Sequence, residues 1–471
     1  MSSPPLLRRR LTLLLSLTIS VAVASTIDAT VTLPLSKFTG NSNPGRLQPT
    51  SPKLLASASL ARAHHIKSRH APKNQTSHSA SSVKTPVFAH AYGAHAVSLT
   101  FGNPPQTLSL IIDTGSTLVW FPCTDHYVCT DCFDPNTKPT RIPTFIPKSS
   151  SSAKILGCAD PKCAWVSHPD VQIRCLNCKH PNSSSCKDKC PSYDVHYGLG
   201  STSGILLSET LHFPEKSVAD FAVGCSTSTE SILTGLAGFG RGPDSLPAQM
   251  GVKKFSYCLN SHHFDDKPES GTIVLGSGSG KTGRVSYSKF EKSPGGVHSF
   301  YNDFYYVNLQ KVIIGGKRVQ IPAIFLASGS DGNGGTVLDT GTTYTYMDRR
   351  VFEIVSGEFE KQMSNYTKDT RLEKRVGLHP CFRVPGGEKS GSIPGLVLGF
   401  EGGAKMVLPV ENYFWFYGEV ACMTLVTDDV FQMGQGPSII LGNYQQQNFY
   451  MEYDLKNERF GFRKQNCERK V

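Results

Sequence analysis

Short apolar runs alternate with turn residues over most of the chain after residue 89. The runs His95–Phe101 and Leu108–Ile112 are separated by the turn cluster Gly102–Pro105. Runs of this kind, bounded by Gly, Pro and Asn, are typical of strands. Further strands are expected at Thr117–Phe121, Thr272–Leu275, Tyr305–Leu309, Lys311–Ile314, Thr336–Leu338 and Phe449–Tyr453. The pattern predicts an all-β body.

One segment has the spacing of an amphipathic helix instead. Within Arg350–Met363, the apolar residues Val351, Val355 and Phe359 recur at intervals of four, and Asp348 precedes them as a suitable N-cap. We therefore predict a helix here and few others.

Two segments precede the β-rich body. Residues 1–24 combine the cluster Arg8–Arg10 with the apolar run Leu11–Ala24, which is the pattern of a secretory signal peptide. Residues 25–86 are rich in Ser, Ala, Pro, Lys and His and have weak periodicity, so we predict a pro-segment or flexible leader. The protein is expected to be secreted, to the extracellular space or cell wall, with the vacuole as an alternative destination.

The positive charge of the chain is concentrated in these first segments. The 471 residues carry a net charge of +11, from 48 Lys and Arg against 37 Asp and Glu. Residues 1–86 hold eleven of the basic residues and one of the acidic ones, so they carry +10 and the remainder carries +1. Phosphate binding needs basic groups on the folded body, which argues against nucleic acid as a partner. Because no apolar run approaches about 18 residues, we expect no stable membrane insertion.

The 14 cysteines all lie between Cys123 and Cys467, and nine of them are crowded between Cys123 and Cys190. The pairs Cys129/Cys132 and Cys175/Cys178 have a spacing that also suits zinc. In an exported chain an even number of cysteines favours disulfides, here up to seven. We expect neither a metal site nor a cofactor, and glycosylation sequons begin at Asn74, Asn182 and Asn365.

One motif occurs twice, and each copy follows an apolar run. Asp113-Thr114-Gly115-Ser116 is matched 226 residues later by Asp339-Thr340-Gly341-Thr342. A single Asp-Thr-Gly is most often only a turn. Two copies in matching contexts predict two similar lobes, residues 87–275 with the Cys-rich insertion and residues 276–471, each of which contributes one aspartate.

Two carboxyl groups that meet head-on cannot easily both ionise, so they share one proton. One can then act as a general base on water, while its protonated partner polarises a substrate carbonyl. The Thr and Ser hydroxyls can orient the carboxylates, and glycine leaves the approach open. This arrangement suits direct attack of water on a peptide bond.

With these motifs the sequence resembles the pepsin-like aspartic endopeptidases, specifically the nepenthesin-like plant type, over residues 90–467. Besides the twin Asp loops, the resemblance rests on Cys190–Tyr193, Tyr197–Ser201, Gly238–Gly240, Phe255–Leu259 and Leu441–Phe449. It implies a bilobal fold with the active-site cleft between the lobes, and a catalytic pair formed by Asp113 and Asp339.

The resemblance also implies roles for residues outside the pair. Tyr197 and Gly198 would form a flap over the substrate, with Trp120 as the partner of the tyrosine. Cys381 would pair with Cys422, and the Cys-rich stretch would be a disulfide-stapled insertion. The substrate would be a polypeptide, cut by a monomer at acid pH. Leu199 departs from the Asp or Thr usual at the flap tip.

Other interpretations remain open from the sequence. A catalytically silent two-lobed protein, such as an inhibitor of cell-wall glycosidases, has the same fold, but here both aspartates are intact. A two-carboxylate glycosidase would not need twin Asp-Thr-Gly loops. The cationic leader either lies across an acidic cleft and keeps a zymogen silent, or is a solvated linker that aids export.

Overall fold

The structure of the chain is a computed structural model that describes residues 30–37, 51–68, 93–132, 142–166, 174–175, 188–198, 200–232, 234–261, 270–276, 283–292, 300–384, 393–427 and 436–467. The predicted signal peptide, the sequons at Asn74 and Asn182, and Leu199 lie outside the described residues.

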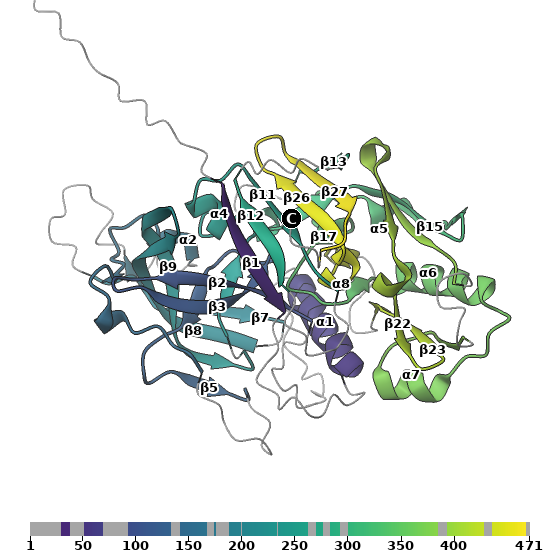
Figure 1. The fold of residues 1–471 in the computed structure, drawn as a ribbon, viewed down its shortest axis with the longest axis horizontal. Helices are drawn as coiled ribbons and strands as arrows, with labels where there is room; N and C mark the ends of the chain where they lie inside the picture. The colour runs from purple at the N-terminus through teal and green to yellow at the C-terminus, as the bar shows by residue number, and fades with distance from the viewer. Residues whose placement is uncertain are drawn as a thin grey trace, which may run out of the picture.

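A 15-stranded sheet runs through the molecule and contains strands from both halves of the sequence (Figure 1). Along its main path it contains β13 (Ser286–Lys289), β27 (Arg459–Lys464), β26 (Phe449–Asp454), β11 (Lys254–Cys258), β12 (Ser270–Leu275), β1 (Val31–Lys37), β2 (His95–Phe101), β3 (Gln106–Asp113), β10 (Leu236–Gly238), β4 (Trp120–Pro122), β9 (Lys216–Glu230), β8 (Gly200–Phe213) and β6 (Lys154–Ile155). Beside this path, β5 (Val128–Thr130) pairs with β9 and β7 (Tyr193–Tyr197) pairs with β8. Because β26 pairs with β11, the last strands of the chain complete the sheet of the first half.

The hairpin of β2 and β3 illustrates how the sequence pattern produces this sheet. Val97, Leu99 and Phe101 are buried while Ser98 is exposed, as expected for a strand with one buried face. The turn begins at Gly102, whose φ of +90° is accessible to glycine at little cost. It sets Phe101 opposite Gln106 and so fixes the register of the whole pair.

Three smaller sheets belong to the second half of the chain. The five-stranded sheet contains β14 (Tyr305–Val307), β17 (Thr336–Leu338), β25 (Ile439–Leu441), β18 (Thr345–Met347) and β24 (Leu425–Val426). The four-stranded sheet contains β16 (Lys317–Arg318), β15 (Leu309–Ile314), β20 (Leu396–Phe400) and β21 (Lys405–Leu408), and the three-stranded sheet contains β19 (Cys381–Arg383), β23 (Val420–Met423) and β22 (Phe414–Tyr417). The all-β fold class with two lobes is thus confirmed.

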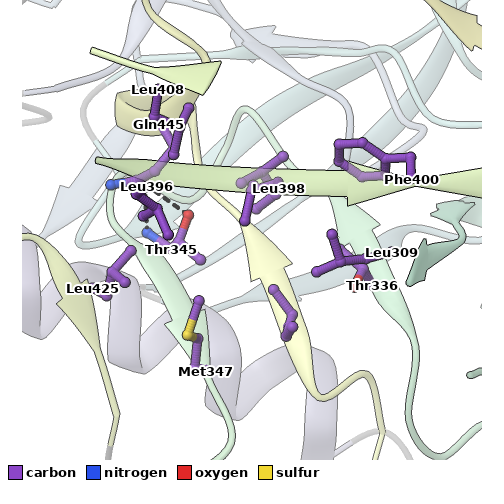
Figure 2. A pocket seen from close by; sticks show the side chains of 12 residues that line it. Leu309, Thr336, Thr345, Met347, Leu396, Leu398, Phe400, Leu408, Leu425 and Gln445 are labelled. Carbon is purple, nitrogen blue, oxygen red and sulfur yellow. Dashed lines mark hydrogen bonds between the residues drawn. The ribbon is translucent and has the colours of Figure 1, made fainter. Parts of the chain in front are cut away.

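An apolar pocket lies between the five-stranded and four-stranded sheets (Figure 2). Met347 and Leu425 line it from the first sheet, and Leu398 and Phe400 from the second. The hydroxyl of Thr345 at its edge donates to the side-chain oxygen of Gln445 at 2.7 Å. Since its lining is almost wholly apolar, this pocket is part of the core that supports β17 and β18.

The described helices are few, and most are short: α1 (Ser51–Ser68), α2 (Cys163–Val166), α4 (Leu246–Gln249), α5 (Ala323–Leu326), α6 (Arg349–Gln362), α7 (Thr370–Val376) and α8 (Asn443–Gln446). The helix predicted at Arg350–Met363 is α6, with Asp348 at its N-cap position and Val351, Val355 and Phe359 buried. None of the helices in the described ranges is long and apolar enough to cross a membrane.

One predicted strand is shorter than its apolar run indicates. The run Thr117–Phe121 forms a strand only from Trp120 onward. Residues 114–119 instead continue the loop that follows Asp113. The hydroxyl groups and backbone amides of this loop form hydrogen bonds within the site described below. Loop geometry therefore overrides strand propensity here.

The leader is folded onto the body where it is described. Strand β1 lies between β12 and β2 and pairs with both, for example Leu35 with Gly271 and with Val97. Helix α1 lies between the two halves of the molecule (Figure 1), where it contacts β7 on one side and β18, β24 and α7 on the other. The weak periodicity of residues 25–86 did not predict either element.

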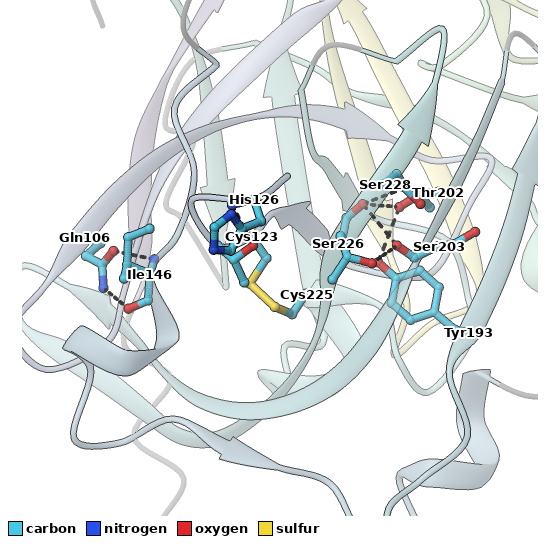
Figure 3. The surroundings of a disulfide bond; sticks show 12 residues. Gln106, Cys123, His126, Ile146, Tyr193, Thr202, Ser203, Cys225, Ser226 and Ser228 are labelled. Atoms are coloured by element: carbon cyan, nitrogen blue, oxygen red, sulfur yellow. Dashed lines mark hydrogen bonds between the residues drawn. A yellow bond between two sulfur atoms is a disulfide. The ribbon is translucent and has the colours of Figure 1, made fainter. Parts of the chain in front are cut away.

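Six disulfides are formed among the described residues. They join Cys123 to Cys225, Cys129 to Cys132, Cys158 to Cys175, Cys163 to Cys190, Cys258 to Cys467 and Cys381 to Cys422. Figure 3 shows the first of them next to a hydroxyl cluster, in which Thr202 donates to Ser226 at 2.9 Å. Cys178 and Cys186 lie outside the described residues, and no described cysteine is free.

Candidate active site

The two Asp-Thr-Gly loops stand at the ends of equivalent strands. Asp113 is the last residue of β3, which β10 joins in parallel, and Asp339 directly follows β17, which β25 joins in parallel. A backbone hydrogen bond to the neighbouring segment anchors each aspartate: Phe239 N donates to Asp113 O at 2.7 Å, and Asp339 N donates to Leu441 O at 3.1 Å. Each lobe therefore presents one aspartate from a rigid strand end.

Reciprocal threonine contacts join the two loops. The backbone N–H of Thr114 donates to the Thr340 hydroxyl at 3.0 Å, and the N–H of Thr340 donates to the Thr114 hydroxyl at the same distance. Each hydroxyl in turn donates across the interface, from Thr114 to Leu338 O at 3.2 Å and from Thr340 to Ile112 O at 2.9 Å. All four groups are satisfied without water, so the loops are fixed relative to each other.

The remaining residues of each motif orient its carboxylate. Gly115 N donates to Asp113 Oδ1 at 2.9 Å and Ser116 Oγ donates to Asp113 Oδ2 at 2.6 Å. In the second loop Gly341 N and Thr342 Oγ1 donate to Asp339 Oδ1 and Oδ2 at 2.8 and 2.6 Å. The two aspartates are 1% and 0% exposed, so these hydrogen bonds hold their side chains in a nearly dry site.

Each glycine lies directly against the aspartate of the other loop. A Cβ on Gly115 would stand 2.5 Å from Asp339 Oδ1, and one on Gly341 would stand 2.5 Å from Asp113 Oδ1. Any larger residue would therefore push the carboxyl groups apart. The motif residues predicted to support the pair are thus all assembled around one point.

A residue of the leader occupies that point. Arg62 of α1 is 6% exposed, and its Nη2 donates to both carboxylate oxygens of Asp113 at 3.0 Å. Its Nε donates to Asp339 Oδ2 at 3.1 Å. The guanidinium thus bridges the two aspartates with the planar fork that arginine offers to carboxylates. Within the described residues, α1 therefore lies directly against both carboxylates.

The pKa values of the two carboxyl groups are displaced in opposite directions. Burial raises the pKa of Asp113 from 3.8 to about 6, with Arg62 opposing this shift and Asp339 adding to it. Burial also acts on Asp339, but there Arg62 and the Thr342 hydroxyl prevail and hold the pKa below its ordinary value. The pair therefore retains one proton, on Asp113, over a range of pH in which Asp339 is ionised.

The predicted flap residues lie above this pair. Tyr197 ends β7 and faces Gly200 of β8 across the hairpin, so Gly198 is at its tip. The indole N–H of Trp120 donates to the Tyr197 hydroxyl at 2.9 Å, and the Tyr197 ring lies 5.9 Å from the guanidinium carbon of Arg62. A Cβ on Gly198 would stand 2.2 Å from Arg62 Cα. The hairpin is thus closed down onto α1.

The position of Arg62 in this arrangement was not predicted, and that of Asn443 was expected from the resemblance alone. Arg62 is one of eleven basic residues in a segment with little pattern, and only the charge of that segment indicated a partner in the cleft. Asn443 was placed behind the second loop only by resemblance, and its amide donates to Thr340 O at 3.0 Å. Within the described residues no group of His, Cys, Asp or Glu suited to a metal ion is found.

Comparison with known proteins places the chain in a family of plant proteins. The profile of the family described as "Xylanase inhibitor N-terminal" matches residues 95–277, and that of "Xylanase inhibitor C-terminal" matches residues 304–464. Aspartic proteinase nepenthesin-2 of Nepenthes gracilis is 32% identical over 396 residues, which cover 83% of this chain and 81% of that protein. Aspartic proteinase nepenthesin-1 of the same plant is 32% identical over 401 residues, which cover 82% and 81%.

A solved structure shares the fold. The crystal structure of edgp matches with a TM-score of 0.58 and 18% sequence identity, over 79% of this chain and 92% of that one.

Proposed function

Because the chain belongs to the nepenthesin-like plant aspartic proteases and is an aspartic-type endopeptidase, we propose that Asp113 and Asp339 activate the water that hydrolyses the peptide bond, at acid pH and outside the cell. The observation that carries this proposal is that the Arg62 guanidinium donates hydrogen bonds to both carboxylates. Asp113 and Asp339 are therefore close enough to contact a single group.

The environment of each carboxyl group supports a division of labour. Without Arg62 the two buried carboxyl groups share one proton, so the ionised group accepts a proton from water and its protonated partner donates a hydrogen bond to the substrate carbonyl. The amides and hydroxyls of Gly115, Ser116, Gly341 and Thr342 keep both groups in place, so little reorganisation is needed in the transition state. Water attacks directly, and no covalent intermediate forms.

The same contacts support the proposal of a zymogen. Since Arg62 occupies the point at which water would bind and Gly198 lies against α1, a substrate cannot enter while the leader is in place. Attraction to Arg62 favours the ionised carboxylates, so lowering the pH weakens it by linkage. Acidification would then release α1 and start maturation.

The proposed location rests on the sequence and on the cysteines. Six disulfides among the described residues are typical of an oxidising compartment. Asn365, at the start of a sequon, is exposed just after α6 and so is accessible to glycosylation. Secretion to the extracellular space, cell wall or vacuole remains the prediction.

Digestion of a denatured protein by the acid-treated full chain tests the proposed function. We expect cleavage at about pH 4 that a statine-type transition-state analogue blocks and that EDTA leaves unchanged, and we expect the N-terminus to move past α1. The rate should fall as the pH rises far enough to remove the proton that the two carboxyl groups share. Cleavage that survives the analogue, or that EDTA abolishes, contradicts the proposal.

A second candidate is a catalytically silent binding protein, because the matched family descriptions name xylanase inhibitors. The intact pair Asp113 and Asp339 argues against this alternative. Inhibition of a xylanase by the full chain, without any peptide cleavage at acid pH, would favour it.

Replacement of Tyr197 by alanine tests the flap. Because the tyrosine closes over the pair and is fixed by Trp120, we expect kcat/KM of the matured enzyme to fall about 10- to 100-fold. The Tm should change by only a few degrees, since Tyr197 lies at the end of a hairpin. Tyr197→Phe, which keeps the ring and loses the hydroxyl, is the matched control and should retain most of the rate. An unchanged rate in the alanine variant would remove Tyr197 from the site.

A further inference from the structure

A second basic residue of α1 is buried in a site of its own. The side chain of Lys67 is 0% exposed, and its Nζ lies 3.2 Å from Asp348 Oδ2 and 3.5 Å from Pro437 O. The same nitrogen stands 5.1 Å from the centre of the Tyr346 ring. A carboxylate, a carbonyl and an aromatic face together offer a cation the three kinds of contact it favours in a dry environment.

These three groups are fixed by the body and not by the leader. Tyr346 lies in β18, and Asp348 follows that strand directly. Pro437 precedes β25, which pairs with β18 through Met347 and Ile439. The backbone N–H of Asp348 also donates to Ser438 O at 2.7 Å, which ties the two segments together. The site is therefore expected to persist when α1 leaves, because its frame is a pair of neighbouring strands.

The carboxylate of Asp348 faces α1 instead of the helix that it precedes. Asp348 is the N-cap residue of α6, yet among the described contacts its side chain accepts no capping hydrogen bond from the first turn. Its side chain is only 4% exposed and holds the Lys67 ammonium. Departure of Lys67 removes a buried positive charge from beside the Asp348 carboxylate, and a lysine or arginine side chain of a substrate can take its place.

The site lies within reach of a substrate in the cleft. Lys67 follows Arg62 by five residues, which in a helix is an axial distance of about 7.5 Å. An extended peptide covers this distance in about two residues. A side chain two to four residues from the bond to be cut could therefore reach Asp348.

The neighbouring surface is apolar. Leu55, Ala63 and Ile66 of α1 pack into a cluster that includes Tyr344, Tyr346 and Tyr444 of the body. Departure of α1 uncovers the Tyr346 ring, which Lys67 contacts together with the Asp348 carboxylate. The geometry thus points to a substrate segment in which one basic side chain is flanked by apolar ones.

We propose that Asp348, Pro437 O and the Tyr346 ring form a subsite of the matured enzyme that binds a lysine or arginine side chain of the polypeptide substrate, and that Lys67 fills this subsite in the full chain. The proposal rests on the proposed function, since it describes the same cleft after the leader has gone.

Kinetics on matched quenched peptides test this subsite. The acid-matured enzyme is given peptides that carry Lys, Arg, norleucine or Glu at one position, two to four residues on either side of the cleaved bond. At one such position we expect Lys and Arg to raise kcat/KM about ten-fold over norleucine, mainly through KM, because the contact forms on binding. Glu there should be the poorest substrate.

Asp348→Asn should reduce the ratio of kcat/KM between the Lys and norleucine peptides to less than about two-fold. Glu353→Gln removes one charge from an exposed position on the same helix and should keep the full preference. If Asp348→Asn does not fold, the wild-type enzyme and the peptide series decide alone. The subsite is contradicted if this enzyme prefers a basic residue at none of the tested positions. Cleavage of the norleucine peptides would still support the proposed function in that case. If no peptide is cleaved, the proposed function fails and the subsite fails with it.

Discussion

Replacing Asp113 or Asp339 by asparagine is expected to abolish peptide-bond hydrolysis by the matured enzyme, with a loss of at least about 10³-fold in kcat. The reaction needs one ionised and one protonated carboxyl group at the same time, and an amide can neither accept the proton of water nor return it. Each single variant should therefore be as inactive as the double variant, which acid-pH kinetics on a quenched peptide would measure.

Folding should not suffer to the same extent. Asparagine has the shape of aspartate. Its oxygen can still accept from the N–H of Gly115 or Gly341, and its NH2 group can donate to the hydroxyl oxygen of Ser116 or Thr342. Thermal unfolding should therefore shift by only a few degrees, and Asp194→Asn, at a half-exposed carboxylate on β7, serves as the matched control. More than a few per cent of wild-type activity in either dyad variant would contradict the assignment.

The second large effect is expected from Arg62→Glu in the full chain. This change removes a buried cation that both carboxylates contact and adds a third negative charge to them. Breaking such a pair costs about 3–5 kcal/mol, so the fraction of molecules with an open cleft should rise by roughly 10² to 4 × 10³-fold. Binding of a fluorescent statine-type inhibitor at neutral pH would measure this fraction independently of turnover.

The pH dependence of the same experiment follows from linkage. Arg62 attracts only ionised carboxylates and holds the pKa of Asp113 below the value that this group has once α1 has left, so the hold of the leader is complete only above that open-state pKa. It weakens as the pH falls through that value, and weakens again when Asp339 takes up a proton in stronger acid. The wild-type full chain should thus bind the inhibitor only after acidification. The Arg62→Glu chain should bind it at every pH at which the matured enzyme binds it.

Lys53→Glu is the matched control, because Lys53 lies on the exposed side of α1 and makes the same change of charge. It should behave as wild type. An Arg62→Glu protein that excludes the inhibitor at neutral pH, while the matured enzyme binds it, would show that Arg62 does not close the site.

The site could be predicted from the sequence because its residues are local. Asp113 and Asp339 each end an apolar strand and carry their own Thr, Gly and hydroxyl partners within three residues. The hydrogen bonds within such a motif form in the same way wherever the strand lies in the fold. The alternating pattern that located β2, β3 and β17 is equally local.

The elements that escaped prediction depend on distant partners. Helix α1 buries Arg62 and Lys67, whose counter-charges lie at least 51 residues away, so its buried face is not an apolar stripe. The pairing of β26 with β11 likewise joins segments nearly two hundred residues apart, and no short-range signal fixes that register. Long-range electrostatic contacts determine where α1 lies, and long-range strand pairing determines where β26 lies.

Strand β1 contributes to the largest sheet, which is a role of the leader in addition to the proposed inhibition of the active site. It fills the place between β12 and β2, so a chain produced without it would fold with two open backbone edges in the interior of its largest sheet. Unpaired edges of this kind invite pairing with other chains. The leader thus acts as a built-in folding partner, and recombinant production of the active body should start from the full-length chain and remove α1 only after the sheet has closed.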